Sequence, residues 1–328
     1  MPRKLESVLK RLKKRGLGCG IVLKPENIFY LTGYYPSSSS ALVVTDKPVL
    51  LVSKMDKNLV SDVTLEHKIV GRFSKEFKKL PYKRIAVEKN FVSVKFVEKK
   101  LKNKKIYDLN FLDEMRRIKD KNEIKSIEKA VKVTEEAFGT IEFDKTEIYA
   151  AASLEHHIRK NGQLAFDAIV AGGTNSAVPH HTPKDTPVSM PVIVDAGARV
   201  ERYNADITRT FLSPVNNEEV QGMYDAVKEA QLAGIRECYH GNEIKRVDIA
   251  VRAVLREYGF EKDFLHSSGH GIGLSVHEKP RLSRDSREKF QMGMVVTVEP
   301  GVYRNFGVRI EDMVLVGKKP KVLTKLKK

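Results

Sequence analysis

Short apolar runs alternate with basic, polar segments along roughly the first third of the chain. The runs GCGIVL, ALVVT, PVLLVS, KRIAVE and KIYDLN, between residues 18 and 110, each predict a buried strand. Ahead of them, four apolar residues at helical spacing predict an amphipathic helix: Leu5, Val8, Leu9 and Leu12. The segment PENIFYLTGYYPSSSS, residues 25–40, indicates a turn-rich loop whose aromatic side chains either line a cleft or pack on one another. We therefore expect a small α/β domain that has no cluster of Asp, Glu and His at ligand spacing.

The pattern changes near residue 113, where a charged stretch begins, and we place the domain boundary there. This gives one domain over residues 1–112 and a second over residues 113–328. Asp120 and Glu123 predict a capping box at the start of a helix, because apolar residues follow at helical spacing. A second helix is predicted to start at Asp144 and to stop at Gly162.

Two stretches of the second domain each predict a β-hairpin that carries two acids. PVIVDAGARVERYNADITRTFL, residues 191–212, supplies Asp195 and Asp206 from strands expected over 192–195 and 205–211. MVVTVEPGVYRNFGVRIEDMVLV, residues 294–316, supplies Glu299 and Glu311. Cross-strand neighbours lie about 4.5–5.5 Å apart, so acids distant in the sequence can meet. Helices are predicted between the hairpins over residues 217–239 and 243–258. Ahead of the first hairpin, FDAIVAGG (166–173) predicts a strand entering a glycine turn, and VPHHTPKDTPV (178–188) predicts a loop.

Composition narrows the class of protein without naming a partner. The net charge is +17, but lysine and arginine are spread along the chain and no nucleic-acid-binding motif accompanies them. We expect a solvated basic surface rather than a nucleic-acid partner. Cys19 and Cys238 match no metal or redox spacing, which fits a reducing compartment. Neither a signal-peptide apolar region nor an apolar run near 18 residues is present, so we expect a cytoplasmic protein away from membranes.

The candidate chemistry lies in four carboxylates and one imidazole: Asp195, Asp206, His270, Glu299 and Glu311. Hard oxygen donors with a single imidazole suit divalent cations. The set exceeds what one tetrahedral zinc needs and suits two ions about 3.5–4 Å apart. Four acids inside apolar strands would repel one another without a cation. The glycine-rich GHGIGLSVHE lacks the spacing of a phosphate loop, and no nucleophile elbow is present.

The motifs VDAGAR, DITRT, GHGIGLSVHE, TVEPG and GVRIED are highly specific as a set. With them the chain resembles the metallopeptidase family that contains prolidase, aminopeptidase P and methionine aminopeptidase. The resemblance covers the whole chain and implies an α+β protein, with a pita-bread catalytic domain after a small α/β creatinase-like N-terminal domain. It implies that Asp195 binds one metal, that His270 and Glu299 bind the other, and that Asp206 and Glu311 bridge both.

The resemblance also implies roles around the metals. His180 matches the family's substrate-binding histidine, and His277 matches the histidine that contacts the scissile amide. Glu299 would also transfer protons as general base and acid. Arg309 is a candidate for holding a substrate carboxylate or for orienting Glu311. Oxygen-dominated ligation favours Mn²⁺ or Co²⁺, and Zn²⁺ or Fe²⁺ could also bind.

Within the family we expect an Xaa-Pro dipeptidase (prolidase) acting on proline-containing dipeptides, and a homodimer. The alternative is aminopeptidase P, which accepts longer peptides. The short N-terminal domain favours prolidase. Methionine aminopeptidase fits less well because of the N-terminal domain, and metal-free creatinase is disfavoured by the intact ligand set. The alternative of another class is a catalytically silent peptide- or nucleic-acid-binding protein on the same fold, which would be expected to lose ligands.

Overall fold

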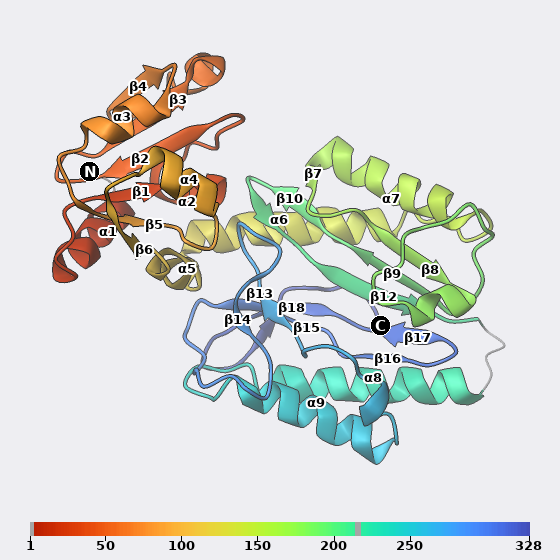
Figure 1. Cartoon of the computed structure of the whole chain (residues 1–328). Coiled ribbons are helices and arrows are strands. Elements are labelled where there is room, and N and C mark those ends of the chain that lie inside the picture. The colour runs from red at the N-terminus through yellow and green to blue at the C-terminus, as the bar shows by residue number, and fades with distance from the viewer. Residues whose placement is uncertain (1–2, 214–217) are drawn as a thin grey trace. The chain divides into compact units, whose positions relative to one another are not determined.

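The computed structural model describes residues 3–213 and 218–328, and the chain forms two compact units that divide between Arg116 and Arg117 (Figure 1). The residue at which the sequence pattern changes, 113, lies inside the last helix of the first unit, α5 (Phe111–Arg116). In the described residues, no helix has the length and apolar character needed to cross a membrane.

The first unit is built on a six-stranded mixed sheet in the order β4-β3-β2-β1-β5-β6. The strands are β1 (Gly20–Val22), β2 (Ser40–Val44), β3 (Val49–Ser53), β4 (His67–Val70), β5 (Arg84–Val87) and β6 (Lys105–Asp108). Five of them were predicted from apolar runs. The edge strand β4 was missed, because three of its four residues are exposed and give it no apolar pattern.

The helices of this unit are α1 (Arg3–Lys14), α2 (Pro25–Thr32), α3 (Phe73–Lys79), α4 (Val94–Lys100) and α5, with a 3-10 helix η1 (Lys54–Leu59). The prediction for α1 is confirmed, since its four apolar residues are buried. The prediction of a loop over 25–40 is wrong for its first half, which is α2. Pro25 occupies the first turn, where a missing N–H costs nothing, and Gly33 ends the helix at φ 77°.

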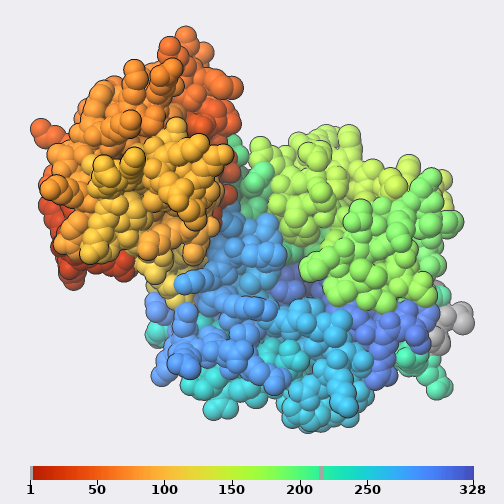
Figure 2. Space-filling view, in the orientation of Figure 1, coloured from red at the N-terminus to blue at the C-terminus, as the bar shows by residue number. Residues whose placement is uncertain are grey.

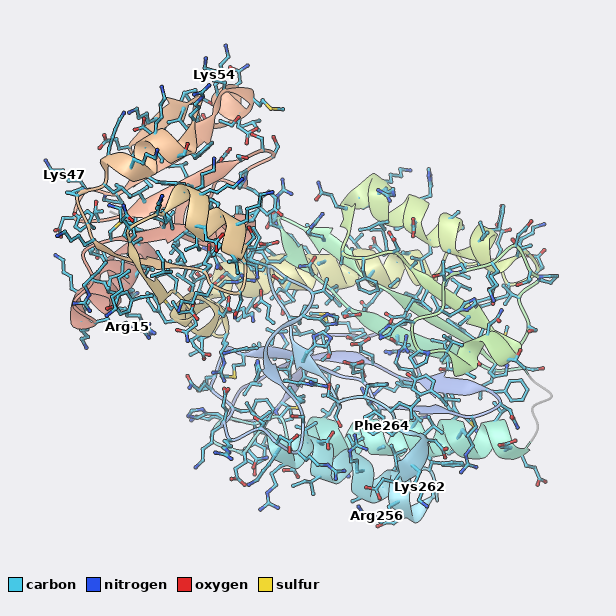
Figure 3. All side chains as sticks on the ribbon, in the orientation of Figure 1. Arg15, Lys47, Lys54, Arg256, Lys262 and Phe264 are labelled. Atoms are coloured by element: carbon cyan, nitrogen blue, oxygen red, sulfur yellow. The ribbon has the colours of Figure 1, made fainter. Side chains whose placement is uncertain are left out.

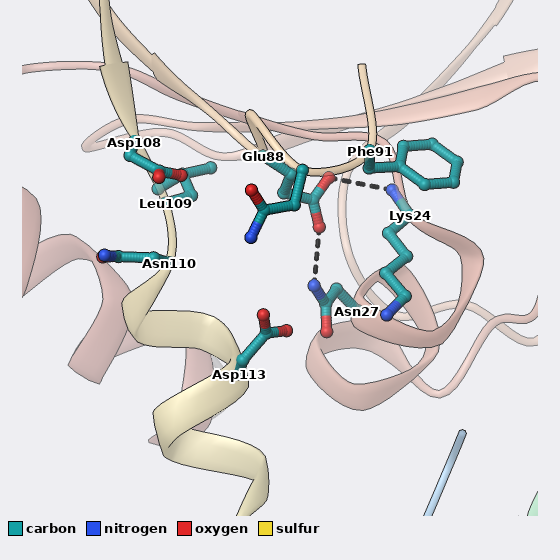
Figure 4. Close-up of a pocket in the computed structure, with 9 residues that line it drawn as sticks. Lys24, Asn27, Glu88, Phe91, Asp108, Leu109, Asn110 and Asp113 are labelled. Carbon is teal, nitrogen blue, oxygen red and sulfur yellow. Dashed lines mark hydrogen bonds between the residues drawn. The ribbon is translucent and has the colours of Figure 1, made fainter. Parts of the chain in front are cut away.

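Two buried carboxylates hold loops of the first unit in place. Glu88, which follows β5, accepts hydrogen bonds from the backbone N–H of Lys24 at 2.8 Å and from Nδ2 of Asn27 at 2.6 Å (Figure 4). It thereby ties β5 to the start of α2. Asp56 accepts bonds from the Tyr34 hydroxyl at 2.6 Å and from Ser37 Oγ at 2.6 Å. The backbone N–H groups of residues 37 and 38 also donate to Asp56, at 2.9 and 3.0 Å.

The second unit combines four long helices with several short sheets. The helices are α6 (Lys121–Phe138), α7 (Glu147–Asn161), α8 (Glu218–Arg236) and α9 (Lys245–Glu257), and the 3-10 helices are η2 (Gly173–Ala177) and η3 (Glu261–Asp263). The predicted capping box of Asp120 and Glu123 is confirmed at α6. The predicted start of α7 is wrong, because Thr146 rather than Asp144 caps it by accepting from the Tyr149 N–H. The predicted start of α8 at residue 217 lies outside the described residues.

Two interrupted hairpins form the centre of this unit. In the first, β9 (Val192–Ala196) pairs antiparallel with β12 (Ile207–Phe211), and β8 (Ile169–Gly172) flanks β9. In the second, β15 (Val295–Val298) pairs antiparallel with β18 (Asp312–Leu315). Each pair encloses a short ribbon, β10 (Ala198–Val200) with β11 (Tyr203–Asn204) in the first, and β16 (Gly301–Tyr303) with β17 (Gly307–Arg309) in the second. The predicted hairpins are therefore present, but each is broken between its outer strands.

The remaining strands extend these sheets. They are β7 (Gln163–Leu164), β13 (His270–Gly271), β14 (Glu278–Arg281) and β19 (Lys321–Val322). The larger sheet has the order β14-β13-β15-β18-β19. Apolar side chains of α8 and α9 share one buried cluster with side chains of β15 to β18. Within this unit, the green segment around α7 and β8 lies against the blue C-terminal strands in Figure 2.

Basic side chains are spread over each unit rather than gathered in one place. Figure 3 shows Arg15, Lys47 and Lys54 projecting from the first unit, and Arg256 and Lys262 projecting from the second. This distribution fits a solvated basic surface.

Candidate metal centre

The two hairpins bring four acids and one histidine together in the second unit. In the first hairpin, Asp195 pairs with Thr208, and Asp206 lies two residues before Thr208, so both acids project from the same face. In the second hairpin, the register of Val298 with Asp312 places Glu299, just after β15, across from Glu311, just before β18. His270 opens β13, the neighbour of β15.

Side-chain ligand atoms of these residues lie close enough to hold cations. Three sets of atoms each fall within 4.8 Å of one another: Asp195 with Asp206 and Glu311, His270 with Glu299 and Glu311, and Asp206 with His270 and His277. The first set is entirely buried. Asp206, Glu311 and His270 each belong to two sets, so these three residues lie where the sets overlap.

The pKa values of the clustered acids indicate that a bound cation would stabilise them. Burial and the negative charges of Glu311 and Asp195 raise the pKa of Asp206 well above its usual value. Burial raises the pKa of Glu299 to about 8, although Arg309 opposes this shift. Burial and the charge of Glu299 likewise raise the pKa of Glu311. Acids whose ionised forms are this unfavourable gain most from a nearby cation.

Individual atoms of the site fit a cation as well. Asp195 Oδ1 and Glu311 Oε1 are buried and accept no hydrogen bond, which is costly for a carboxylate oxygen in a protein interior. His270 donates from Nδ1 to the carbonyl of Gly271 at 3.0 Å, so its other nitrogen carries a free lone pair. That Nε2 lies 3.6 Å from an oxygen of Asp206 and 3.5 Å from one of Glu299. A lone pair among carboxylate oxygens is the arrangement of a metal ligand.

Glycine allows the backbone to bring His270 this close. Gly269 has φ 152°, and a Cβ placed on it would lie 2.1 Å from the carbonyl oxygen of Thr297. Neither the backbone conformation nor the space admits a side chain. Glycine at residue 269 therefore permits the close approach of β13 to β15 that places His270.

Arg309 is buried beneath the cluster, and its guanidinium is engaged within the protein. It donates from Nη2 to Asp195 Oδ2 at 2.8 Å, from Nε to Thr208 Oγ1 at 3.1 Å, and from Nη1 to the Tyr303 hydroxyl at 2.9 Å and the Pro179 carbonyl at 3.0 Å. Thr208 Oγ1 in turn donates to Glu311 Oε2 at 2.9 Å. Four of five N–H groups are thus used. In this arrangement Arg309 supports Asp195 directly and reaches Glu311 through Thr208, and its expected contact with a substrate carboxylate stays a prediction.

Three further histidines surround the cluster. The ring of His277 is exposed and lies edge-on to that of His270, with centroids 4.3 Å apart. Burial and a nearby His180 lower the pKa of His277, and burial lowers the pKa of His266 to about 4. Both imidazoles are therefore neutral near pH 7. His266 bonds to the Tyr303 hydroxyl at 3.0 Å and so supports a partner of Arg309.

Sequence reasoning missed the supports of the site. Thr208 and Tyr303 were not singled out, although Thr208 lies inside the motif DITRT and Tyr303 lies two residues after TVEPG. Their positions two after Asp206 and four after Glu299 are the only signal that the sequence offers. Their partners lie in other strands, and a pattern along one strand does not reveal them.

Comparison with known proteins identifies the family in which this arrangement of acids and histidine occurs. Residues 124–318 match the model of metallopeptidase family M24, and residues 4–118 match the creatinase/prolidase N-terminal domain. An uncharacterised peptidase of Methanocaldococcus jannaschii is 37% identical over 97% of this chain and 94% of its own.

Solved structures extend the likeness to the fold. The prolidase of Pyrococcus horikoshii has a TM-score of 0.95 at 31% identity and is covered over 99% of its length by 100% of this chain. The X-Pro aminopeptidase of Thermotoga maritima has a TM-score of 0.89 at 31% identity, with 98% of each chain covered. The expected pita-bread fold with a creatinase-like N-terminal domain is confirmed. The chain belongs to metallopeptidase family M24, whose chemistry depends on divalent metal ions.

Proposed function

We propose that this chain is an Xaa-Pro dipeptidase that hydrolyses proline-containing dipeptides. The observation that carries the proposal is the buried cluster of four acids and His270, in a chain that is similar over its full length to a prolidase. The chemistry that a bound pair of divalent cations supplies is Lewis-acid activation of water and of the scissile carbonyl. Mn²⁺ or Co²⁺ are the ions we expect, with Zn²⁺ or Fe²⁺ as alternatives.

We assign the holding of the cations to five side chains. Asp195 would bind one ion, and His270 with Glu299 would bind the other. Asp206 and Glu311 would bridge them, as the family resemblance implies, and both acids lie where the sets of ligand atoms overlap. Arg309 and Thr208 would keep two of these carboxylates, Asp195 and Glu311, in position.

We assign proton transfer to Glu299 and carbonyl polarisation to two histidines. Glu299 Oε1 lies 3.5 Å from His270 Nε2, at the partly exposed side of the cluster, where it can take a proton from water and return it to the leaving proline nitrogen. His180 and His277 are exposed, and His277 is neutral near pH 7, so its ring N–H can donate to an oxygen that gains negative charge. Such a preorganised donor contributes about 3–4 kcal/mol.

Aminopeptidase P activity is the second candidate, because the X-Pro aminopeptidase of Thermotoga maritima is also similar over nearly the whole chain. A dipeptidase has to close around a free proline carboxylate, and an aminopeptidase has to leave that end open.

The test is hydrolysis of Ala-Pro beside Ala-Pro-Ala by protein reconstituted with Mn²⁺ or Co²⁺, with a chelator control. Cleavage of Ala-Pro alone supports the dipeptidase. Preference for Ala-Pro-Ala supports aminopeptidase P. Absence of cleavage with any metal contradicts both and favours a silent binding protein on this fold. Cleavage that a chelator does not stop contradicts metal-dependent hydrolysis at this site.

We further propose a domain division near residue 113, a homodimer, and a cytoplasmic location. The division is supported by the change of pattern at that point in the sequence. The free and buried state of Cys19 and Cys238 supports a reducing compartment. Size-exclusion chromatography with light scattering tests the dimer.

A further inference from the structure

A buried carboxylate at the start of α7 organises the loop that carries His180. Glu147 is 1% exposed and accepts four hydrogen bonds. Its Oε1 accepts from the N–H of Gly172 at 2.7 Å and from Nδ2 of Asn175 at 3.0 Å. Its Oε2 accepts from His181 Nε2 at 2.8 Å and from the N–H of Lys184 at 3.0 Å. Gly172 and Lys184 flank residues 173–183, which we name the histidine loop, and the other two donors lie within it.

His180 is fixed on both sides within the histidine loop. On its N-terminal side, the carbonyl of Pro179 accepts from Arg309, the same guanidinium that holds Asp195. On its C-terminal side, the ring of His181 is 4% exposed and bonded to Glu147. His180 itself is exposed, and it lies close enough for its charge to lower the pKa of His277.

The contacts of Glu147 and His181 suit a structural support of the loop rather than a reacting group. The Glu147 carboxylate remains ionised near neutral pH. Burial opposes ionisation, but its hydrogen bonds, above all the one from the Gly172 N–H, lower its pKa. A carboxylate with four donors has no free lone pair aimed at solvent. His181 is buried, whereas its neighbour His180 is exposed. The two adjacent histidines are therefore suited to different roles. The buried His181 can support the loop, and the exposed His180 is available for contact with a substrate.

We propose that Glu147 and His181 are positioning residues that set the orientation of His180 toward the substrate. The proposal rests on the proposed function, in which His180 contacts the dipeptide. A donor displaced by about 1 Å loses much of its effect, so release of the His181 ring should weaken substrate recognition about 10-fold. The metal ligands lie on other elements and should keep their ions.

The experiment is a double-mutant cycle on the metal-loaded full chain, with Ala-Pro as substrate. His181→Ala is expected to raise KM about 10-fold, with metal content unchanged and a smaller effect on kcat. His181→Gln keeps an N–H donor near the position of Nε2 and should restore KM to within about 3-fold of the unmodified chain. In a His180→Ala background, His181→Ala should have no further effect, because residues that act through one another are not additive.

A matched control separates positioning from general loss of packing. Glu123 is also a buried glutamate in the first turn of a helix, and it accepts from the Tyr203 hydroxyl at 2.8 Å. Glu123→Gln should lower stability without the KM effect. An equal KM effect in Glu123→Gln, or full additivity of His181→Ala with His180→Ala, would overturn the proposal.

A second measurement does not depend on catalysis. Hydrogen exchange on the metal-free chain should show the amide of Lys184, which donates to Glu147, exchanging at least about 10-fold faster in His181→Ala, with β9 unchanged. Unchanged exchange would refute the structural support of the loop even if the chain hydrolysed no dipeptide. Faster exchange in a chain that leaves Ala-Pro intact would reject the dipeptidase assignment and the KM effect while retaining the structural support of the loop.

Discussion

Raising the pH should destabilise the metal-free protein through Glu299. The usual pKa of a glutamate is 4.5, and burial raises the pKa of Glu299 to about 8 in the folded chain. The folded state therefore holds a proton that the unfolded state has released. The free-energy cost of ionising Glu299 in the folded chain is absent below pH 4.5, grows as the pH rises, and reaches its full value above pH 8.

The size of the effect follows from the shift in pKa. Each unit corresponds to about 1.4 kcal/mol, so a shift from 4.5 to about 8 sets an upper limit of about 5 kcal/mol. Glu299 lies at the partly exposed side of the cluster, and water that enters the metal-free site reduces the cost. We expect the free energy of unfolding to fall by about 2–3 kcal/mol between pH 5.5 and 8 because of this residue.

The assay is urea unfolding with a chelator at both pH values. The chain contains no tryptophan, so far-ultraviolet circular dichroism is the signal to follow. Glu299→Gln should be stabilising by about 1 kcal/mol at pH 5.5 and by about 3–4 kcal/mol at pH 8. Saturating Mn²⁺ should reverse the pH dependence of the unmodified chain, because metal binding requires deprotonated ligands. The exposed Glu257 supplies the control variant Glu257→Gln. The reasoning fails if Glu299→Gln leaves the difference between the two pH values unchanged.

Three further outcomes are expected. His277→Ala should lower kcat about 100-fold or more with metal content intact, and loss of metal instead would make His277 a ligand. Arg309→Lys keeps the charge but not the fork of donors, so the Kd for metal, read by calorimetry, should rise about 10-fold or more; unchanged affinity would show that Asp195 needs no such support. Asp56→Ala removes four hydrogen bonds and should destabilise the first unit by about 3 kcal/mol in denaturant titrations at pH 7. The loss should shrink to about 1 kcal/mol at pH 2, because hydrogen bonds from Ser37 and Tyr34 outweigh burial and lower the pKa of Asp56 to about 2; an equal loss at both pH values would reject this account.

The sequence predicted those elements whose apolar residues recur at the spacing of a strand or a helix. Apolar runs located five of the six strands in the first sheet, and the motif acids located both hairpins. The edge strand β4 and helix α2 were not predicted, because β4 presents mostly exposed residues and α2 has only two turns. In such short elements, contacts with the rest of the fold decide the conformation rather than propensity.

The candidate ligands could be named from the sequence, but their supports could not. Acids in apolar strands are conspicuous in a sequence because burial makes them costly. Arg309 and Glu147 carry no such signal. Glu147 accepts from Gly172, 25 positions away, and Arg309 donates to Asp195, 114 positions away. Side-chain partners between strands are set by register and packing, which no single stretch of sequence specifies.

The division of the four acids between two interrupted hairpins has a consequence for how the enzyme is made. Asp195 and Asp206 are joined by a local turn, whereas more than 80 residues, including α8 and α9, separate them from Glu299 and Glu311. A nascent chain that ends before β15 offers only two of the four acids, together with His270. Loading with metal therefore has to follow the docking of the C-terminal strands, and contacts this distant in sequence form late. The rate at which newly made protein becomes able to retain metal should report the completion of folding.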